Sequence, residues 1–240
     1  MKLTDVTKQA RKLLKLKYCG AVIVAAGNAS RMEGIDKVMA ELGGEPMILR
    51  TIRTFQNCDA IREIVVVTRP DLLTTIMGLC KNFNKVTAVV SGGKDRAESV
   101  GLGLNALSSK VKLAAVQDGA RPLITWQVID RVVRAANTYG AAAPAVPVKD
   151  TIKEAAGGLV VTTPDRSRLQ AVQTPQVFDF DMIRGALKQA ILEEAPITDD
   201  CSAVERMGMS VKIVEGDERN IKVTTPLDLK IAELFLEEMQ

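Results

Sequence analysis

The sequence predicts an α/β fold in which a doubly wound, mostly parallel, Rossmann-like sheet carries an inserted β-hairpin arm. The chain has 240 residues, of which 47% are hydrophobic, and this suits one large domain with a buried core. Short apolar runs alternate with segments of helical spacing, a pattern typical of parallel strands buried on both faces. Farther along the chain, a glycine-containing turn separates two strand-like segments, which predicts the hairpin.

Four apolar runs and four helix-like segments account for the first half of the chain. We expect strands at 20–26, 64–67, 86–90 and 113–116, and helices near 46–57, 71–82, 95–107 and 125–138. This βαβα order implies parallel pairing with right-handed crossovers. Ligands of doubly wound sheets bind beyond the carboxyl ends of the strands, so the loops that follow these strands are the places to look for a site.

The stretch 147–163 interrupts the alternation. Residues 148–153 and 159–163 are strand-like, and the turn Ala155-Ala156-Gly157-Gly158 lies between them. A lone two-stranded hairpin is only marginally stable in water, so this β-arm, at about 147–166, is expected to pack against another surface. A second subunit is the obvious candidate, and we therefore expect a homodimer.

The last third of the chain returns to helices and strands. A helix is expected at 179–194, strands at 211–214 and 221–223, and a final helix beginning at Thr225-Pro226, with a threonine cap and a proline in the first turn. No internal repeat or low-complexity linker interrupts the sequence. We therefore interpret 18–240 as a single domain and 1–17 as a basic N-terminal extension.

The distribution of charge argues against nucleic acid as a partner. The net charge is +3, but the extension alone carries six basic residues against Asp5, which leaves −2 for the rest of the chain. A body so close to neutral has no basic stripe for a phosphate backbone, and an aromatic content of 3% leaves little for base stacking.

The cysteines and the first apolar run bear on location. Cys19, Cys58, Cys80 and Cys201 form no C-x-x-C pair, and the sequence has no histidine to complete a zinc site, so reduced thiols in a cytoplasm are the simplest interpretation. The run 20–26 is short, β-branched and ends at a glycine, which favours a buried strand over a signal peptide. No segment is long enough to predict a membrane span.

The loop after the first predicted strand has the composition of a phosphate-binding turn. It contains the small residues Ala25, Ala26 and Gly27, followed by Arg31 and Lys37. Small residues let backbone N–H groups approach phosphate oxygens, and the two cations supply full charges that a triphosphate needs. The segment matches neither a Walker loop nor the dinucleotide fingerprint. The alternative is an ordinary turn with solvated basic side chains.

The third predicted strand ends in a second glycine turn. Gly92-Gly93 precedes Arg96 and Ser99, and a backbone of this kind could read the edge of a nucleobase. Gly101-x-Gly103, a few residues later, is better explained by packing of the following helix.

The fourth predicted strand ends in Asp118, three residues before Arg121. The carboxylate suits a metal ion or a substrate hydroxyl, and the guanidinium suits a phosphate. The alternative for this pair is a local ion pair that stabilises the turn.

Taken together, these loops resemble those of the 2-C-methyl-D-erythritol 4-phosphate cytidylyltransferases of the non-mevalonate isoprenoid pathway. The resemblance runs in order over roughly 20–230. Besides the three loops, it includes Asp150-Thr151, Asp165-Arg166, Thr174-Pro175-Gln176, Thr198-Asp199, Val214-Glu215-Gly216 and Asn220-Ile221-Lys222-Val223-Thr224.

The resemblance implies a nucleotidyltransferase sheet, a reaction of CTP with a small polyol phosphate, Mg²⁺ or another divalent cation, and a role for each matching residue. Arg31 and Lys37 correspond to the cations that stabilise the transition state at the α-phosphate, and Arg166 and Lys222 to those that position the attacking phosphate. The implied nucleotide-binding residues are Ala25, Ala26, Gly27, Gly92, Gly93, Arg96 and Ser99. The implied substrate-binding residues are Asp118, Arg121 and Thr151, with Asp118 also a candidate metal ligand and some of them contributed across the dimer by the arm. Lys94 stands where an acidic residue is common.

Alternatives come from the same and from other classes. A ribitol 5-phosphate cytidylyltransferase shares most of the nucleotide loops and differs mainly in polyol recognition. A catalytically silent nucleotide-binding module and a dinucleotide-dependent oxidoreductase are more distant possibilities. Without a histidine the chain cannot use a serine–histidine triad, and a phosphate nucleophile needs no such base.

Overall fold

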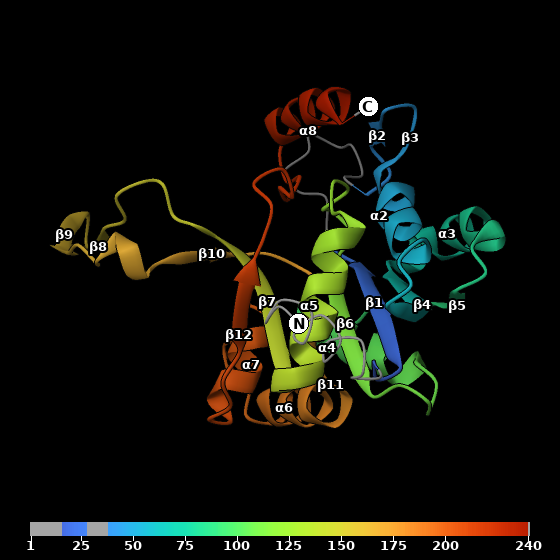
Figure 1. The fold of residues 1–240 in the computed structure, drawn as a ribbon, viewed down its shortest axis with the longest axis horizontal. Helices are drawn as coiled ribbons and strands as arrows, with labels where there is room; N and C mark the ends of the chain where they lie inside the picture. Colours follow the sequence, from blue (N-terminus) through green and yellow to red (C-terminus); the bar gives the residue numbers. More distant parts are fainter. Residues whose placement is uncertain (1–15, 28–37, 240) are drawn as a thin grey trace, which may run out of the picture.

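The computed structural model describes residues 16–27 and 38–239. The predictions made for Arg31, for Lys37 and for most of the basic extension lie outside these residues. An eight-stranded sheet forms the centre of the molecule, with the order β10-β7-β11-β6-β1-β4-β5, and β12 pairs with β7. Figure 1 shows this sheet with helices around it. The doubly wound, mostly parallel sheet predicted from the sequence is confirmed.

Four parallel strands make the core of the sheet, and all four were predicted. They are β1 (Cys19–Ala25), β4 (Ile61–Thr68), β5 (Val86–Ser91) and β6 (Leu113–Asp118). β1 lies between β4 and β6 and pairs with both in parallel register. Most of their residues are buried, because helices cover both faces and leave only apolar side chains favourable there.

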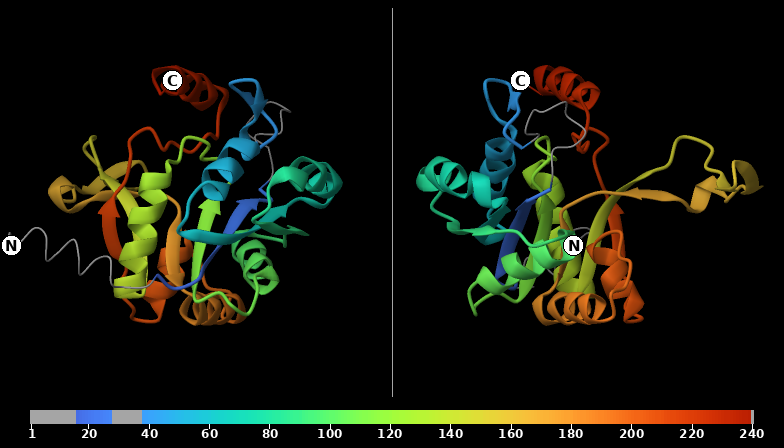
Figure 2. Two further views of the ribbon diagram at one scale, coloured as in Figure 1. Left: turned by 45° about the vertical axis from the view of Figure 1, so that its right-hand side comes forward. Right: turned by 180° about the vertical axis from the view of Figure 1, so that it is seen from behind.

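Helices form a layer on each face of the sheet (Figure 2). α2 (Met47–Gln56), α3 (Leu73–Leu79) and α5 (Trp126–Tyr139) contribute to one apolar cluster with the sheet. α4 (Arg96–Ala106), α6 (Phe180–Leu192) and α7 (Asp200–Arg206) contribute to the other. The helix predicted at 71–82 consists of α3 flanked by single 3₁₀ turns at Pro70–Leu72 and Cys80–Asn82.

In the other half of the sheet most strand pairs are antiparallel, and most of these strands were not predicted from the sequence pattern. β7 (Ala141–Pro147) pairs antiparallel with β10 (Gln170–Val172) and β11 (Gln176–Asp179), and in parallel with β12 (Lys212–Glu215). Only β12 was predicted. β7 consists mainly of alanine with two prolines, residue types that are depleted in strands, so its sequence does not indicate a strand.

The β-arm projects from the sheet beside β10, but its first strand was placed wrongly (Figure 1). The hairpin pairs β8 (Glu154–Ala156) with β9 (Leu159–Thr162), so the strand expected at 148–153 is absent from the described residues. Gly157 and Gly158 both have positive φ and form a two-residue turn, so pairing starts at once on either side of them. Residues 148–153 lie outside this ladder, which ends at the pair Glu154 and Thr162.

The C-terminal helix α8 (Pro226–Glu238) begins as predicted. Thr225 and Asp228 form a reciprocal capping box, and Pro226 occupies the first turn. The helix contributes to a third apolar cluster with Val223 and Ala120, and it lies beside the small hairpin β2 (Glu41–Leu42) and β3 (Glu45–Pro46). The strand expected at 221–223 is not formed: Val223 donates one backbone hydrogen bond to Ala120, and no ladder follows.

All four cysteines are free and buried, as the sequence analysis expected for reduced thiols. Burial raises the pKa of the Cys80 thiol to about 11, and it raises the pKa of the other three as well. No helix among the described residues is both long and apolar enough to span a membrane.

Candidate active site

A cleft of about 440 Å³ opens where the parallel strands end. The loops that follow β1, β4, β5 and β6 all contribute to its walls, together with Lys222 from the segment before α8. This is the position at which a doubly wound sheet binds its ligands. Residues from the sequence prediction that line the cleft are Ala25, Ala26, Gly27, Gly92, Gly93, Arg96, Ser99, Asp118 and Lys222.

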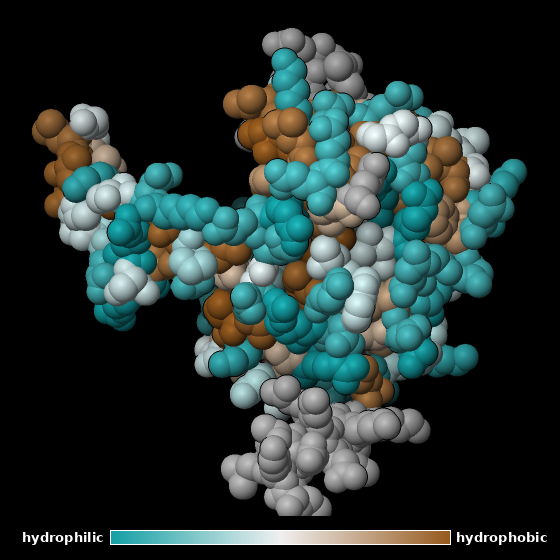
Figure 3. All heavy atoms as spheres, turned by 45° about the horizontal axis from the view of Figure 1, so that its top comes forward, coloured by the Kyte–Doolittle hydropathy of each residue, from teal (hydrophilic) through white to brown (hydrophobic). Residues whose placement is uncertain are grey.

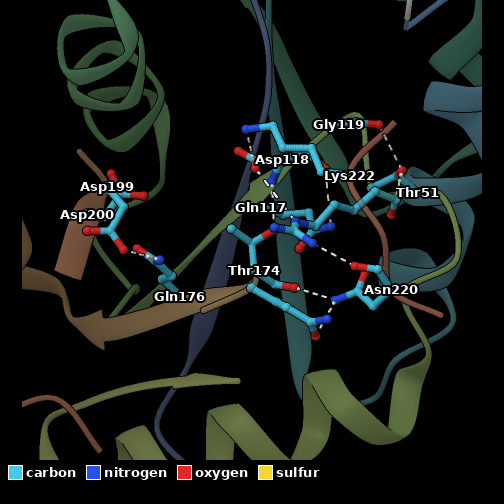
Figure 4. A network of polar contacts seen from close by, with 12 residues as sticks. Thr51, Gln117, Asp118, Gly119, Thr174, Gln176, Asp199, Asp200, Asn220 and Lys222 are labelled. Carbon is cyan, nitrogen blue, oxygen red and sulfur yellow. Dashed lines mark hydrogen bonds and ion pairs between the residues drawn. The ribbon is translucent and has the colours of Figure 1, made fainter. Parts of the chain in front are cut away.

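Asp118 lies among three cations in this cleft. Figure 4 shows it beside one of them, Lys222. The Asp118 carboxylate is 2.8 Å from Lys222 Nζ, 3.5 Å from Arg96 Nη2 and 3.7 Å from Arg121 Nε. Asp118 is the last residue of β6, whereas Lys222 comes from a segment more than a hundred residues later. The fold therefore brings together residues that were predicted from separate motifs.

The charge of Asp118 is maintained by its neighbours. Burial opposes ionisation of this carboxyl group, but the charges of Lys222 and Arg96 outweigh that effect and lower its pKa below the usual value for aspartate. Asp118 is therefore an anion near neutral pH, able to bind a substrate hydroxyl or a metal ion.

The turn between β5 and α4 is held by Ser99. Its hydroxyl accepts a hydrogen bond from Gly93 N at 3.1 Å and donates one to Asp95 O at 2.7 Å. Gly92 approaches β1 so closely that a Cβ there would lie 2.4 Å from Ala26 Cβ, which explains why glycine is needed. The Gly93 N–H is thus hydrogen-bonded within the turn, and Ser99 shapes the wall of the cleft. The reading of a nucleobase edge by the backbone of this turn stays a prediction.

Arg121 is largely buried, and it bonds to the backbone of a distant segment. Its side chain is only 12% exposed and is absent from the residues that line the cleft. Arg121 Nη1 donates to the carbonyl oxygen of Asn220 at 2.6 Å. Asn220 is fully buried, and its amide also donates to Thr174 O at 3.0 Å. Arg121 and Asn220 together hold the segment that presents Lys222 to Asp118.

Two further groups were missed by the sequence analysis. Arg69, Pro70 and Asp71 line the cleft directly after β4, and the rule of inspecting the loop after each strand would have found them. Asp200, at the start of α7, is fully buried, and its Oδ2 lies 2.8 Å from Arg96 Nη2. No local motif marks Asp200, because the partner that explains it is distant in the sequence.

The predicted residues of the arm lie outside the cleft of their own chain. Neither Arg166 nor Thr151 is among its lining residues, and both are exposed. Arg166 Nη1 donates to Lys149 O at 2.6 Å within the arm. Arg31 and Lys37 lie outside the described residues, but Gly27 and Val38, which flank that segment, both line the cleft.

The described residues contain no group of three or more histidine, cysteine or acidic side chains placed to hold a metal ion. Any metal in this cleft would therefore draw few ligands from the described residues. Mg²⁺ suits such a site, since it commonly binds one or two carboxylates together with substrate phosphates.

Comparison with known proteins gives a consistent picture. The family model described as 2-C-methyl-D-erythritol 4-phosphate cytidylyltransferase matches residues 19–238. A curated protein of that name from Caldanaerobacter subterraneus subsp. tengcongensis is 45% identical over 221 residues, which are 90% of this chain and 97% of the relative. Another from Symbiobacterium thermophilum is 46% identical over 219 residues, covering 90% and 92%. The crystal structure of 4-diphosphocytidyl-2C-methyl-D-erythritol synthase from Anaerococcus prevotii superimposes with a TM-score of 0.84 at 30% identity, covering 92% of this chain and 99% of that one.

Proposed function

The chain belongs to the 2-C-methyl-D-erythritol 4-phosphate cytidylyltransferase family, and we propose that its reaction takes place in the cleft around Asp118 and Lys222. It transfers a cytidylyl group from CTP to 2-C-methyl-D-erythritol 4-phosphate. The products are 4-diphosphocytidyl-2-C-methyl-D-erythritol and pyrophosphate, in non-mevalonate isoprenoid precursor biosynthesis.

CTP is proposed to lie along the loops after β1 and β5. Ala25, Ala26 and Gly27 offer a backbone without bulky side chains, which a triphosphate can approach closely. Gly92 and Gly93 form the opposite wall, and Ser99 holds their conformation through its bond from Gly93 N. In this arrangement Arg31 and Lys37 stabilise the charge that develops at the α-phosphate.

The attacking group is the phosphate of the polyol substrate, which is already ionised near neutral pH. The protein therefore needs to align this phosphate with the α-phosphorus and offset the negative charge that accumulates there. Lys222 is proposed to position the attacking phosphate, while Asp118 orients the substrate and limits the freedom of the Lys222 ammonium through their 2.8 Å contact. Arg121 supports both by holding Asn220.

Mg²⁺ or another divalent cation is proposed as the cofactor, held by Asp118 together with phosphate oxygens of CTP. When bound, such an ion supplies positive charge that draws electron density from the triphosphate and assists departure of pyrophosphate. Asp118 fits this role because its pKa is lowered and its carboxylate is charged near neutral pH. Lys222 and Arg96 would share that carboxylate with the ion.

A homodimer joined through the β-arm is proposed to complete the site. Arg166 and Thr151 lie on the arm, away from the cleft of their own chain, so they can act only if the arm reaches a second subunit. The exposure of Leu159, Val160 and Val161 on β9 supports this, since each is more than 60% exposed. Figure 3 shows hydrophobic residues at the end of the arm, away from the body of the molecule.

A cytoplasmic location is proposed as well. The four cysteines are free and buried rather than paired, which suits a reducing compartment. Oxidising compartments favour disulfides, and none forms among these four residues.

The convergence of Asp118 and Lys222 at the ends of the parallel strands is the observation that supports this mechanism most strongly. We propose a pyrophosphate-release assay with CTP and Mg²⁺, in which 2-C-methyl-D-erythritol 4-phosphate and ribitol 5-phosphate are supplied separately. Turnover is expected with the first substrate and little with the second. Preferential use of ribitol 5-phosphate, or CTP binding without turnover of either substrate, would contradict the assignment.

A further inference from the structure

Asp200 is an acidic residue whose burial the reaction itself does not explain. Burial raises the pKa of its carboxyl group above the usual value, and the charge of Arg96 opposes that effect. Asp200 lies in the first turn of α7, and its side chain is fully buried. Neither carboxylate oxygen makes a hydrogen bond of ordinary geometry with the described residues. A buried carboxylate is destabilising unless a cation lies close to it, so the position of its ionic partner is informative.

Arg96 is that partner, and it faces two carboxylates at once. Its Nη2 atom lies 2.8 Å from Asp200 Oδ2 but 3.5 Å from Asp118 Oδ1. The shorter contact is a close ion pair, whereas the longer one is a hydrogen bond at the upper limit of length. The guanidinium is therefore held more closely by the buried acid than by the acid at the floor of the cleft.

We propose that Asp200 is a positioning residue, which holds the Arg96 guanidinium back from Asp118 and so keeps the Asp118 carboxylate available to a hydroxyl group of the polyol phosphate. The inference rests on the substrate-binding role proposed for Asp118. With Asp200 present, Arg96 offsets part of the negative charge of Asp118 without forming a second tight ion pair beside the one with Lys222. Without that acid, Arg96 turns toward the other carboxylate within its reach, and Asp118 becomes engaged.

The surroundings of Arg96 leave it few alternatives. Asp199, the neighbouring acid, accepts hydrogen bonds from Ser202 N at 2.9 Å and from Gln176 Nε2 at 2.7 Å, so both of its oxygens are occupied (Figure 4). Asp118 is thus the acceptor to which a released Arg96 is closest. A substitution at Asp200 should therefore act on substrate binding through Arg96.

The first test is Asp200→Asn, which removes the charge and preserves the shape. We expect the KM for 2-C-methyl-D-erythritol 4-phosphate to rise on the order of tenfold, the range of coupling measured between contacting residues, with a smaller change in kcat. KM does not depend on the amount of folded enzyme, so partial unfolding cannot imitate this result. The matched control is Glu205→Gln, an exposed acid on the same helix, which should leave KM unchanged.

The second test is a double-mutant cycle with Arg96→Gln. If Asp200 acts through Arg96, then Asp200→Asn should change KM by less than about twofold in the Arg96→Gln background, because no guanidinium remains to be released. An equal effect of Asp200→Asn in both backgrounds, or no effect in either, would overturn the inference. Asp118→Asn tests the role of Asp118 independently of Asp200. An unchanged KM for this variant would refute the proposed role of Asp118. A raised KM for this variant, together with an additive double-mutant cycle, would refute only the role of Asp200.

Discussion

Asp118 and Lys222 form the central ion pair of the cleft. Their contact of 2.8 Å brings a carboxylate from the end of β6 to an ammonium from the segment before α8. Arg96 and Arg121 add two guanidinium groups around the same carboxylate. The excess of positive charge at the cleft floor suits two anionic substrates that must approach each other.

Lys222→Ala tests the role of this ammonium. Removing the ammonium that positions the attacking phosphate should cost about 3 kcal/mol, which corresponds to roughly a hundredfold or more in kcat. Steady-state pyrophosphate release measures the effect, and Lys188→Ala, an exposed lysine on α6, serves as the control. Turnover of Lys222→Ala close to that of the control would exclude the proposed role.

The lowered pKa of Asp118 predicts a dependence of stability on pH. Because its pKa is lower in the folded state, its ionised form contributes stability that is present above the unfolded-state value of about 4 and is lost as the pH falls through the folded-state value. The difference in free energy of unfolding between the wild type and Asp118→Asn should therefore be constant near neutral pH and shrink below about pH 4. Urea titrations at several pH values measure it. A difference that grows on acidification would be inconsistent with this prediction.

Site residues that lie in recognisable sequence motifs could be predicted from the sequence. Site residues whose role depends only on contacts with distant parts of the chain could not. Asp118 and Lys222 were predicted from separate segments, and the structure brings them together. Asp200 was missed because a single acid in a short helix has no local pattern, and only the nearby Arg96 explains it. The contact of Arg121 with a substrate phosphate stays a prediction, whereas its bond to Asn220, almost a hundred positions later, could not be predicted from local spacing.

Among the elements, the parallel strands were predicted well and the antiparallel edge was not. β1, β4, β5 and β6 are continuous apolar runs because both faces of the sheet are covered, and this makes them visible in the sequence. β7 contains mostly alanine, a residue with little preference for strands, and its conformation depends on three neighbouring strands.

Helix α4 offers a matched pair of substitutions that tests its packing on the sheet. A Cβ at Gly103 would lie 2.3 Å from Val22 Cγ1 and 2.7 Å from Val67 Cγ2, whereas a Cβ at Gly101 would meet nothing within 4 Å. Gly103→Ala should therefore lower the free energy of unfolding by about 1–3 kcal/mol through overpacking. Gly101→Ala should raise it by about 0.5–1 kcal/mol, because alanine favours the helix. Equal effects of the two substitutions in urea unfolding would contradict this packing.

For the whole molecule, the arm determines whether one chain contains a complete site. Its exposed Val160 and Val161 lie on the same short strand, and the adjoining segments carry Arg166 and Thr151. If a second subunit covers this strand, apolar area is buried and the two polar residues reach the partner's cleft.

A charged substitution on the arm tests this assembly. Val160→Asp combined with Val161→Asp should shift the protein from dimer to monomer in sedimentation velocity at micromolar concentration, and should reduce turnover as well. Leu192→Asp, which replaces an apolar residue that is 74% exposed on α6, is the matched control and should remain dimeric. A wild-type protein that sediments as a monomer under these conditions would refute the proposed dimer.

The most direct test of the mechanism is a crystal structure of the protein with CTP and Mg²⁺. The triphosphate should lie in the cleft, with its α-phosphate within about 4 Å of the side chains of Arg31 and Lys37, as charge-assisted contacts require, and with Lys222 facing the side from which the attacking phosphate approaches. A nucleotide bound elsewhere on the molecule, or an α-phosphate in this cleft with Arg31 and Lys37 far from it, would contradict the account.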